Sequence, residues 1–166
     1  QQMTLAMYRL EVPAVAAING PAIGAGLDLC CMCDIRIGST HAKVGSTFVN
    51  LGIIPGDGGA WFLPRLIGIQ RAAELMFSGR IVAPAESVAL GLMMEVTEPD
   101  ALLPRAREIA AQFAGKPRDA LRIAKRLLWA GQRLELGDFL DYCASQQSLC
   151  HTSGQHQAAL QAFMTK

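Results

Sequence analysis

Two aspartates lie beside glycine-rich turns and could exchange protons with a bound ligand. Asp28 follows Gly24-Ala25-Gly26 after one leucine, and Asp57 lies within the loop 55–59 (PGDGG). A carboxylate acts as a general acid or base when its pKa suits the reaction. Each aspartate also has a purely structural interpretation. Asp28 suits the first turn of a helix, where the dipole favours an acid, and Asp57 suits the N-cap of a helix beginning near residue 60.

The segment 19–28 (NGPAIGAGLD) has the pattern of a glycine-rich loop that opens a helix. The first N–H groups of a helix have no internal partners, and the helix dipole makes that end positive. Small residues also let a ligand approach the backbone closely. The segment therefore predicts a site for an anion or a developing oxyanion, with a plain strand-to-helix connection as the alternative. Its glycine spacing fits neither the dinucleotide fingerprint nor a Walker A loop.

An α/β arrangement over residues 1–100 is expected to position these groups, and residues 101–166 are expected to form a helical region. The continuous apolar run at 14–18 is typical of a strand buried on both faces. Gly79 and Gly91 are typical residues for helix ends. Further along the chain, apolar residues recur at helical spacing. The expected strands are 14–18, 34–37 and 92–96, and the expected helices are 27–32, 60–66, 71–78, 84–90, 101–113 and 118–128, with weaker helical patterning over 138–163.

Composition excludes several classes of protein. The chain has 166 residues, 51% of them apolar and 17% charged, which predicts a folded domain. The net charge of +1 gives no general attraction to nucleic acid or to an anionic membrane. Polar residues and glycines interrupt the longest apolar stretch, so no membrane span is expected. Cysteines crowded at 30, 31 and 33 favour thiols in a reducing compartment such as the cytoplasm, and no metal-ligand spacing is present.

Three ordered blocks of sequence resemble the crotonase (enoyl-CoA hydratase/isomerase) family. They are VPAVAAINGPAIGAGLDLCCMCDIRIGS at 12–39, LGIIPGDGGAWFLPRLIG at 51–68 and SGRIVAPAESVALGLMMEV at 78–96. The resemblance is close over residues 12–97 and looser through the helical tail. It implies that residues 1–100 form the C-terminal part of a spiral of β-β-α units, with the family's first strands missing from this chain. Residues 101–166 would be the C-terminal helices, which pack into homotrimers or into hexamers built from two trimers.

The resemblance also implies a function and a set of site residues. Members of the family hold the carbonyl oxygen of an acyl-CoA thioester between two backbone N–H groups and stabilise its enolate. One donor would be Ala25, and the other would lie in a motif upstream of residue 1. An enzyme of fatty acid metabolism is implied, either a lyase or an isomerase, with no cofactor beyond the CoA of its substrate. Substrate contacts are expected at Ala22, Ile23, Gly24, Gly26, Phe48, Pro55, Gly56 and Trp61.

The chain departs from the family pattern at one important position. Hydratases of the family use two glutamates, which would fall on Asp28 and Phe48. Phenylalanine cannot position or activate water, so the two-carboxylate hydration does not carry over. Some members that shift double bonds carry an aspartate at the first position, which Asp28 fits, and others carry one at the position of Gly56, next to Asp57. The departure leaves open a non-catalytic member of the family that binds acyl-CoA or serves in assembly.

Overall fold

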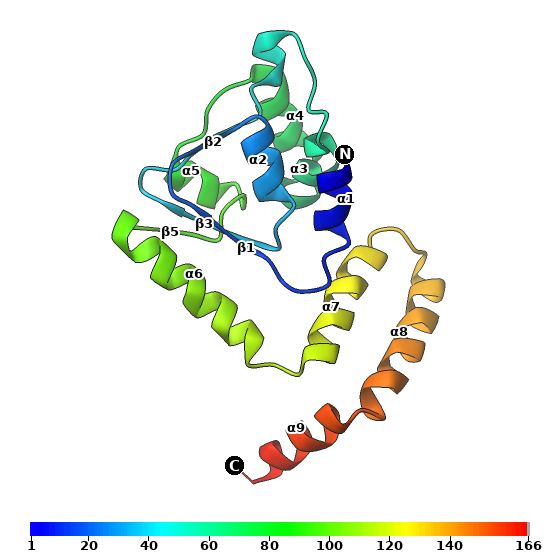
Figure 1. The fold of residues 1–166 in the computed structure, drawn as a ribbon. Coiled ribbons are helices and arrows are strands. Elements are labelled where there is room, and N and C mark those ends of the chain that lie inside the picture. The colour runs from blue at the N-terminus through cyan, green and yellow to red at the C-terminus, as the bar shows by residue number, and fades with distance from the viewer. Residues whose placement is uncertain (166) are drawn as a thin grey trace. The chain divides into compact units, whose positions relative to one another are not determined.

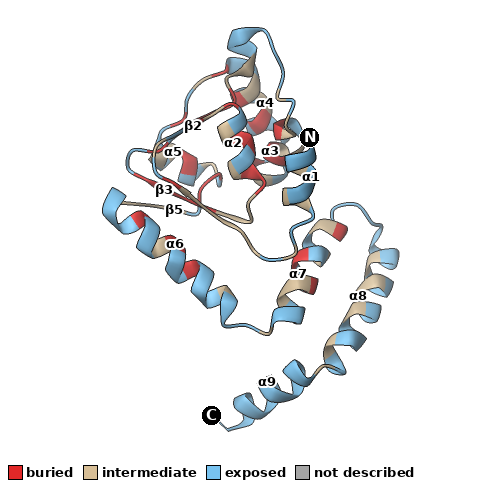
Figure 2. Cartoon of the chain, viewed as in Figure 1, coloured by how far each residue is buried: buried red, intermediate tan, exposed pale blue. Residues whose placement is uncertain are grey.

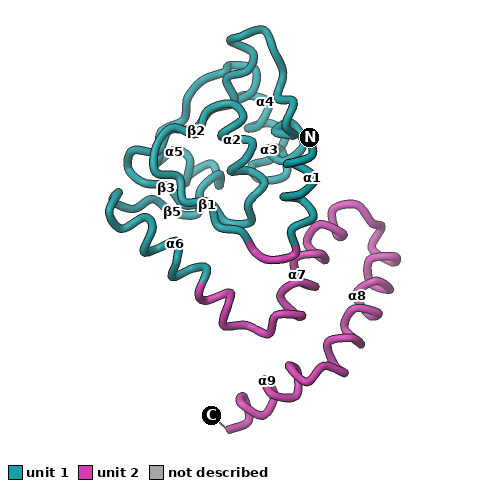
Figure 3. Tube along the Cα trace, viewed as in Figure 1, with its two compact units in different colours: residues 1–10, 14–110 teal, residues 11–13, 111–166 magenta. Residues whose placement is uncertain are grey.

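The computed structural model describes residues 1–165 and divides the chain into two compact units. The first unit contains residues 1–10 and 14–110, and the second contains residues 11–13 and those from 111 onward (Figure 3). The glycine-rich turns and both candidate aspartates lie in the first unit. The expected division near residue 100 stays a prediction.

Short parallel strands form two small sheets in the first unit. The three-stranded sheet has the order β1-β3-β5, and the two-stranded sheet pairs β2 with β4. Val15 lies opposite Ile35 and Pro21 opposite Lys43, so each chain turn repeats the path of the one before. This repetition confirms the expected spiral of β-β-α units. The strands are β1 (Val15–Ile18), β2 (Pro21–Ile23), β3 (Ile35–Ser39), β4 (Lys43–Gly45) and β5 (Glu95–Thr97).

Helices cover the strands of the first unit and supply most of its core. Figure 1 shows α2, α3 and α4 gathered together beside the strands, and Figure 2 shows buried residues where these helices meet them. Leu27, Ile37, Leu63, Leu75 and Leu92 are almost completely buried. The helices are α1 (Gln2–Tyr8), α2 (Ala25–Cys31), the 3-10 helix η1 (Phe48–Leu51), α3 (Gly59–Ile67), α4 (Ile69–Ser78), α5 (Pro84–Ala89) and α6 (Pro99–Ala114).

The strongly patterned elements of the sequence are confirmed with small shifts of their ends. Four short elements were not predicted: α1, β2, β4 and η1. β2 begins at Pro21, which the sequence analysis placed in the glycine-rich loop. Proline is tolerated as the first residue of a strand. With three residues each, β2 and β4 are too short to show a period-two pattern.

The second unit contains residues 11–13, the end of α6, and helices α7 (Arg118–Ala130), α8 (Leu136–His151) and α9 (Gly154–Met164). Glu11 forms ion pairs with Arg122 and Arg126, and the Lys125 ammonium donates to the Val12 carbonyl at 2.8 Å. Within the described residues, α8 and α9 contain no buried side chain. Across residues 1–165, no helix is both long enough and apolar enough to cross a bilayer.

Candidate active site

The first part of the site is the start of α2. Gly24 has φ 56° and ψ −119°, a conformation that favours glycine, and its N–H donates to the Gly45 carbonyl at 2.8 Å. The first turn of the helix closes when the Asp28 N–H donates to the Gly24 carbonyl at 3.1 Å. The N–H groups of Ala25 and Gly26 precede that bond, and Ala25 is exposed. The N–H groups of Ala25 and Gly26 thus lie at the positive end of α2, where an oxyanion would be stabilised.

Asp28 lies one turn further along α2, with its carboxylate inside the protein. The residue is only 1% exposed, and one carboxylate oxygen accepts the Gly59 N–H at 3.2 Å. Burial raises the pKa of Asp28 from its ordinary 3.8 to about 6. The hydrogen bond from Gly59 lowers this pKa, and the negative charge of Asp57 raises it by a smaller amount. A carboxyl group in this range can both accept and release a proton near neutral pH.

Gly59 leaves the space that the Asp28 carboxylate occupies. A Cβ atom on residue 59 would lie 2.0 Å from one carboxylate oxygen and 2.6 Å from the carboxyl carbon. The backbone of Gly59 has an ordinary helical conformation, so the contact with Asp28, not the backbone, is what excludes a side chain. Gly59 was part of the PGDGG loop noted in the sequence but was not a predicted site residue.

The burial of Asp28 predicts that the charged carboxylate destabilises the fold. Because its pKa is raised in the folded state, the folded chain binds more protons than the unfolded chain between pH 3.8 and about 6. Stability contributed by the protonated form is therefore lost as the pH rises through that window. We expect Asp28→Asn to be more stable than the wild type at pH 7 by roughly 3 kcal/mol, from about 1.4 kcal/mol per pKa unit. Urea denaturation of both proteins at pH 4 and pH 7 measures the difference, and an equal gap at both pH values would contradict the prediction.

Phe48 lies against the glycine that precedes the α2 donors. Two carbon atoms of its ring are each 3.6 Å from the position that a Cβ on Gly24 would occupy. The residue is half-buried at the start of η1. An apolar ring therefore covers the backbone next to Ala25. Gly24 and Phe48 therefore lie close together beside Ala25, and their assignment to one substrate site stays a prediction.

The loop between η1 and α3 carries the second candidate aspartate. Asp57 is half-buried, and its backbone carbonyl accepts the Thr4 hydroxyl at 3.0 Å. The N-cap interpretation of Asp57 is wrong, because Gly58 is the N-cap of α3 and, within the described chain, receives no side-chain cap. Pro55 is half-buried and Gly56 is exposed.

The remaining residues that were predicted to contact the substrate differ in how far they are buried. Trp61 packs its ring edge-on to Tyr8, with ring centroids 5.6 Å apart, and the Arg65 guanidinium lies 3.9 Å from the Trp61 ring centroid. Ala22 is buried in β2, while Ile23 and Gly26 are half-buried. Sequence reasoning missed Thr4, Gly45 and Gly59. The doubled glycine at 58–59 was the one local signal available for them.

Cys30 and Cys31 of α2 are unsuited to nucleophilic chemistry. Burial raises the pKa of the Cys30 thiol to about 11 and that of Cys31 to about 12. Both thiols are therefore protonated at neutral pH. Among the described residues, no group of three or more histidine, cysteine or acidic side chains is arranged to hold a metal ion.

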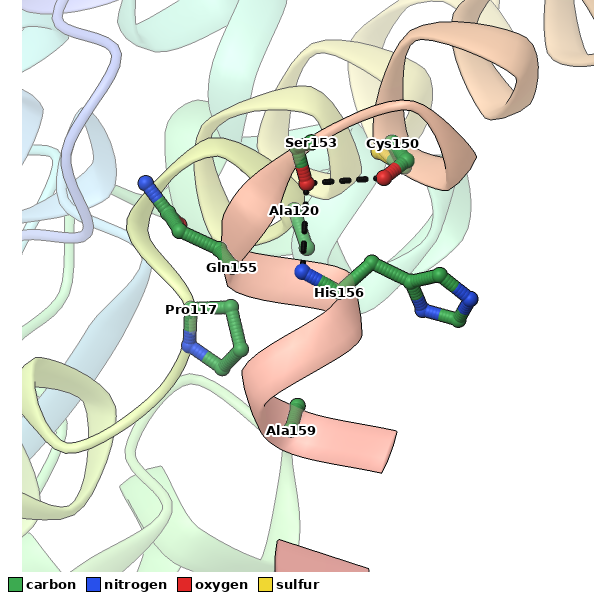
Figure 4. Close-up of a pocket in the computed structure, with 7 residues that line it drawn as sticks. All are labelled: Pro117, Ala120, Cys150, Ser153, Gln155, His156 and Ala159. Carbon is green, nitrogen blue, oxygen red and sulfur yellow. Dashed lines mark hydrogen bonds between the residues drawn. The ribbon is translucent and has the colours of Figure 1, made fainter. Parts of the chain in front are cut away.

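A small cavity in the second unit offers no alternative site for a large ligand. Its volume is about 90 Å³, whereas pockets for drug-sized ligands span roughly 300–1,000 Å³. Figure 4 shows the Ser153 hydroxyl between the Cys150 carbonyl and the His156 N–H, with the His156 ring directed away from Pro117. These hydrogen bonds belong to the turn between α8 and α9. The lining residues are Pro117, Ala120, Cys150, Ser153, Gln155, His156 and Ala159.

Comparison with known proteins gives consistent relatives in sequence and in structure. A family model described as enoyl-CoA hydratase/isomerase matches residues 1–166. A crotonyl-CoA hydratase of Syntrophomonas wolfei is 34% identical over 157 residues, covering 95% of this chain and 60% of that protein. A short-chain-enoyl-CoA hydratase of Clostridioides difficile is 35% identical over 149 residues, covering 90% and 96% respectively. The crystal structure of an enoyl-CoA hydratase from Bacillus anthracis superposes with a TM-score of 0.96 at 35% identity, covering 99% of this chain and 64% of that one.

The lengths of these relatives limit what transfers from them. The chain spans 60% of the Syntrophomonas wolfei protein and 64% of the Bacillus anthracis structure. The activity, substrates and partners of the whole relatives therefore reach this chain only as proposals.

Proposed function

The chain belongs to the enoyl-CoA hydratase/isomerase family, and from that membership we propose that it processes acyl-CoA thioesters through a stabilised enolate. The Ala25 N–H polarises the thioester carbonyl oxygen, and Asp28 exchanges a proton with the acyl chain. The observation that carries the proposal is the buried Asp28 carboxylate one helical turn from the exposed Ala25 donor. The pKa of Asp28, near 6, allows either protonation state at neutral pH.

Isomerisation requires a single proton carrier, which Asp28 supplies. The Asp28 carboxylate removes a proton from the α carbon of a 3-enoyl-CoA, and that C–H electron pair moves toward the thioester carbonyl. The developing oxyanion receives the Ala25 N–H at the positive end of α2. Asp28, now protonated, returns the proton to the γ carbon as the double bond moves to the 2,3 position. The enolate collapses and the carboxylate is restored, so the cycle needs no metal or redox partner.

Phe48 favours isomerisation over hydration within this proposal. Hydration requires a water molecule that is held and deprotonated next to the β carbon. The Phe48 ring lies beside Gly24 and has no group that could bind or activate water. A shift of the double bond requires no water, which makes it the reaction that this arrangement supports best.

The experiment that tests the proposal is NMR of a 2-enoyl-CoA and a 3-enoyl-CoA with the full native protein in deuterated water. A moved double bond, or deuterium at the α carbon, supports enolate chemistry with Asp28 as the base. Formation of a 3-hydroxyacyl-CoA would show hydration and would direct attention to Asp57 as a second carboxylate. No change in either substrate would count against a role as an enzyme acting on these thioesters.

A binding or assembly protein is the second candidate. The observation that favours it is the phenylalanine at position 48, where hydratases of the family carry a carboxylate. Titration calorimetry with a saturated acyl-CoA, alongside the NMR experiment, separates the two candidates. Micromolar affinity without turnover would favour the binding role, whereas affinity together with proton exchange would favour the enzyme.

We also propose that α8 and α9 bury their apolar residues in a homotrimer. Leu136, Leu140 and Phe163 are 71%, 56% and 79% exposed. Apolar side chains exposed together on neighbouring helices indicate an interface between proteins. We expect sedimentation to give three times the chain mass, and Leu136→Lys to shift the protein toward the monomer. Ser145→Lys is the matched control on the opposite side of α8, and equal dissociation by both variants would argue against an interface at Leu136.

A further inference from the structure

Helix α1 packs through one narrow face against the loop between η1 and α3 and against the start of α3. Thr4, Met7 and Tyr8 are half-buried, whereas the other residues of the helix are exposed. These three positions share one side of a helix because they are spaced by three and four residues. The Thr4 hydroxyl donates to the Asp57 carbonyl at 3.0 Å, and the Tyr8 ring packs edge-on to Trp61. The contacts therefore fall just before and just after the start of α3.

The segment between these contacts is the one that holds the Asp28 carboxylate. Gly58 follows Asp57 and has φ 101°, a conformation that strains any other residue. A Cβ on Gly58 would lie 3.3 Å from the Thr4 methyl carbon and 3.2 Å from the Phe62 ring, so both groups close over the turn. The next residue, Gly59, donates its N–H to Asp28 at 3.2 Å. Helix α1 is thus linked to the hydrogen bond that Asp28 accepts from Gly59. The link consists of the Thr4 hydroxyl and the Asp57 carbonyl, with one residue between Asp57 and Gly59.

We propose that Thr4 is a positioning residue for Asp28, acting through the Asp57 carbonyl and the Gly59 N–H. This inference rests on the proposed function, because it assigns Thr4 a role in the proton transfer at Asp28. The Thr4 hydroxyl fixes the peptide plane after Asp57 and thereby sets where the Gly59 N–H points. Without that hydroxyl, the half-buried Asp57 carbonyl loses a partner and the turn is free to rotate. The carboxylate then keeps its place in the core but loses the donor that favours its charged form.

The test compares Thr4→Val, which keeps the shape and removes the hydroxyl, with Thr4→Ser, which keeps the hydroxyl. Thr40→Val is the matched control, because Thr40 is exposed in the loop between β3 and β4. We expect Thr4→Val to lower kcat about 10-fold with little change in KM, since a small misplacement of a reacting group is costly. We expect Thr4→Ser and Thr40→Val to retain the wild-type kcat.

A titration of Asp28 distinguishes positioning from a general loss of structure. The Gly59 hydrogen bond lowers the Asp28 pKa, so weakening it in Thr4→Val should move the midpoint further above the wild-type value. The acid limb of the pH-rate profile and the ¹³C carboxyl signal of Asp28 both report this shift. An unchanged midpoint in a folded Thr4→Val protein would overturn the proposal. A Thr4→Ser protein that behaves like Thr4→Val would also overturn it, since packing and not the hydroxyl would then matter.

The two readouts keep this inference separate from the proposed function. If the wild type turns over no acyl-CoA, the proposed function fails, but the ¹³C titration still measures whether Thr4 controls Asp28. If the wild type is active and Thr4→Val leaves both kcat and the titration unchanged, the proposed function stands and the role of Thr4 is rejected.

Discussion

Replacing Asp28 with asparagine is expected to lower kcat about 10³-fold on any 3-enoyl-CoA that the wild type isomerises, within the range found for positioned general bases. Asparagine has nearly the same size, and its carbonyl oxygen can still accept the Gly59 N–H, so the turn should keep its structure. Only the ability to take up a proton is lost. KM should change little, because the Ala25 donor and the contact surface remain. Steady-state kinetics at pH 7 measures both quantities.

The expected rise in stability makes the Asp28 experiment unusually clear. If Asp28→Asn is inactive and also more stable than the wild type at pH 7, unfolding cannot explain the loss. Asp100→Asn is the matched control, because Asp100 is exposed in the first turn of α6. Wild-type turnover by Asp28→Asn would refute the assignment of the base.

Asp57→Asn separates the two candidate carboxylates. The negative charge of Asp57 raises the pKa of Asp28, so removing it should lower that pKa and move the acid limb of the rate profile to lower pH. A loss of kcat as large as that of Asp28→Asn would instead make Asp57 a proton carrier in its own right.

The second large effect is expected from Gly59→Ala. The added Cβ would lie 2.0 Å from a carboxylate oxygen of the buried Asp28, so the carboxylate would have to leave its place beside residue 59. We expect kcat to fall about 100-fold as the carboxylate is displaced. Stability should fall by about 1–3 kcal/mol, as in other overpacked cores. Kinetics and thermal unfolding of the same preparation measure the two effects.

Gly20→Ala is the matched control for this substitution. A Cβ on Gly20 would meet nothing within 4 Å, and the residue does not require a positive φ. Its kinetics and stability should match those of the wild type. A Gly59→Ala protein with wild-type kcat would mean that the Asp28 carboxylate is held elsewhere during turnover. If Gly59→Ala does not fold, the double variant Asp28→Asn/Gly59→Ala tests the same clash. Asparagine is as large as aspartate, so the double variant should be as unstable as Gly59→Ala if the steric clash is the cause.

The parts of the candidate site that depend on neighbouring residues could be predicted from the sequence. Gly24 has a conformation that favours glycine, and Ala25 and Asp28 lie in the first turn of the helix that follows. A local pattern could indicate where these three residues lie in the fold, whereas their roles stay predictions. Burial of Asp28 could not be predicted, because it depends on Gly59, which lies 31 residues away. The position of Phe48 over Gly24 likewise depends on the parallel pairing of β2 with β4.

The position of α1 could not be predicted from the sequence either. The helix is seven residues long, and its half-buried face includes the polar Thr4, so its sequence shows no clear apolar stripe. Its position follows from contacts made by Thr4 and Tyr8 with residues more than fifty positions later. Long-range contacts of this kind leave no pattern in the neighbouring sequence. For this reason the side chain of Asp57 was interpreted as a helix cap, whereas the structural contact is made by its backbone carbonyl with the Thr4 hydroxyl.

The sheet order of the first unit also has a consequence for how the isolated 166-residue polypeptide behaves at high concentration. β1 lies at the edge of its sheet, and on its outer side it pairs with no strand among residues 1–165. An apolar, uncharged edge strand is a template for the strand of another molecule. Association through such an edge is open-ended and grows with concentration, whereas a trimer closes and stops. If the mean mass of this polypeptide keeps rising as its concentration is increased, strands are adding at β1. A mass that levels off at three chains indicates the closed trimer.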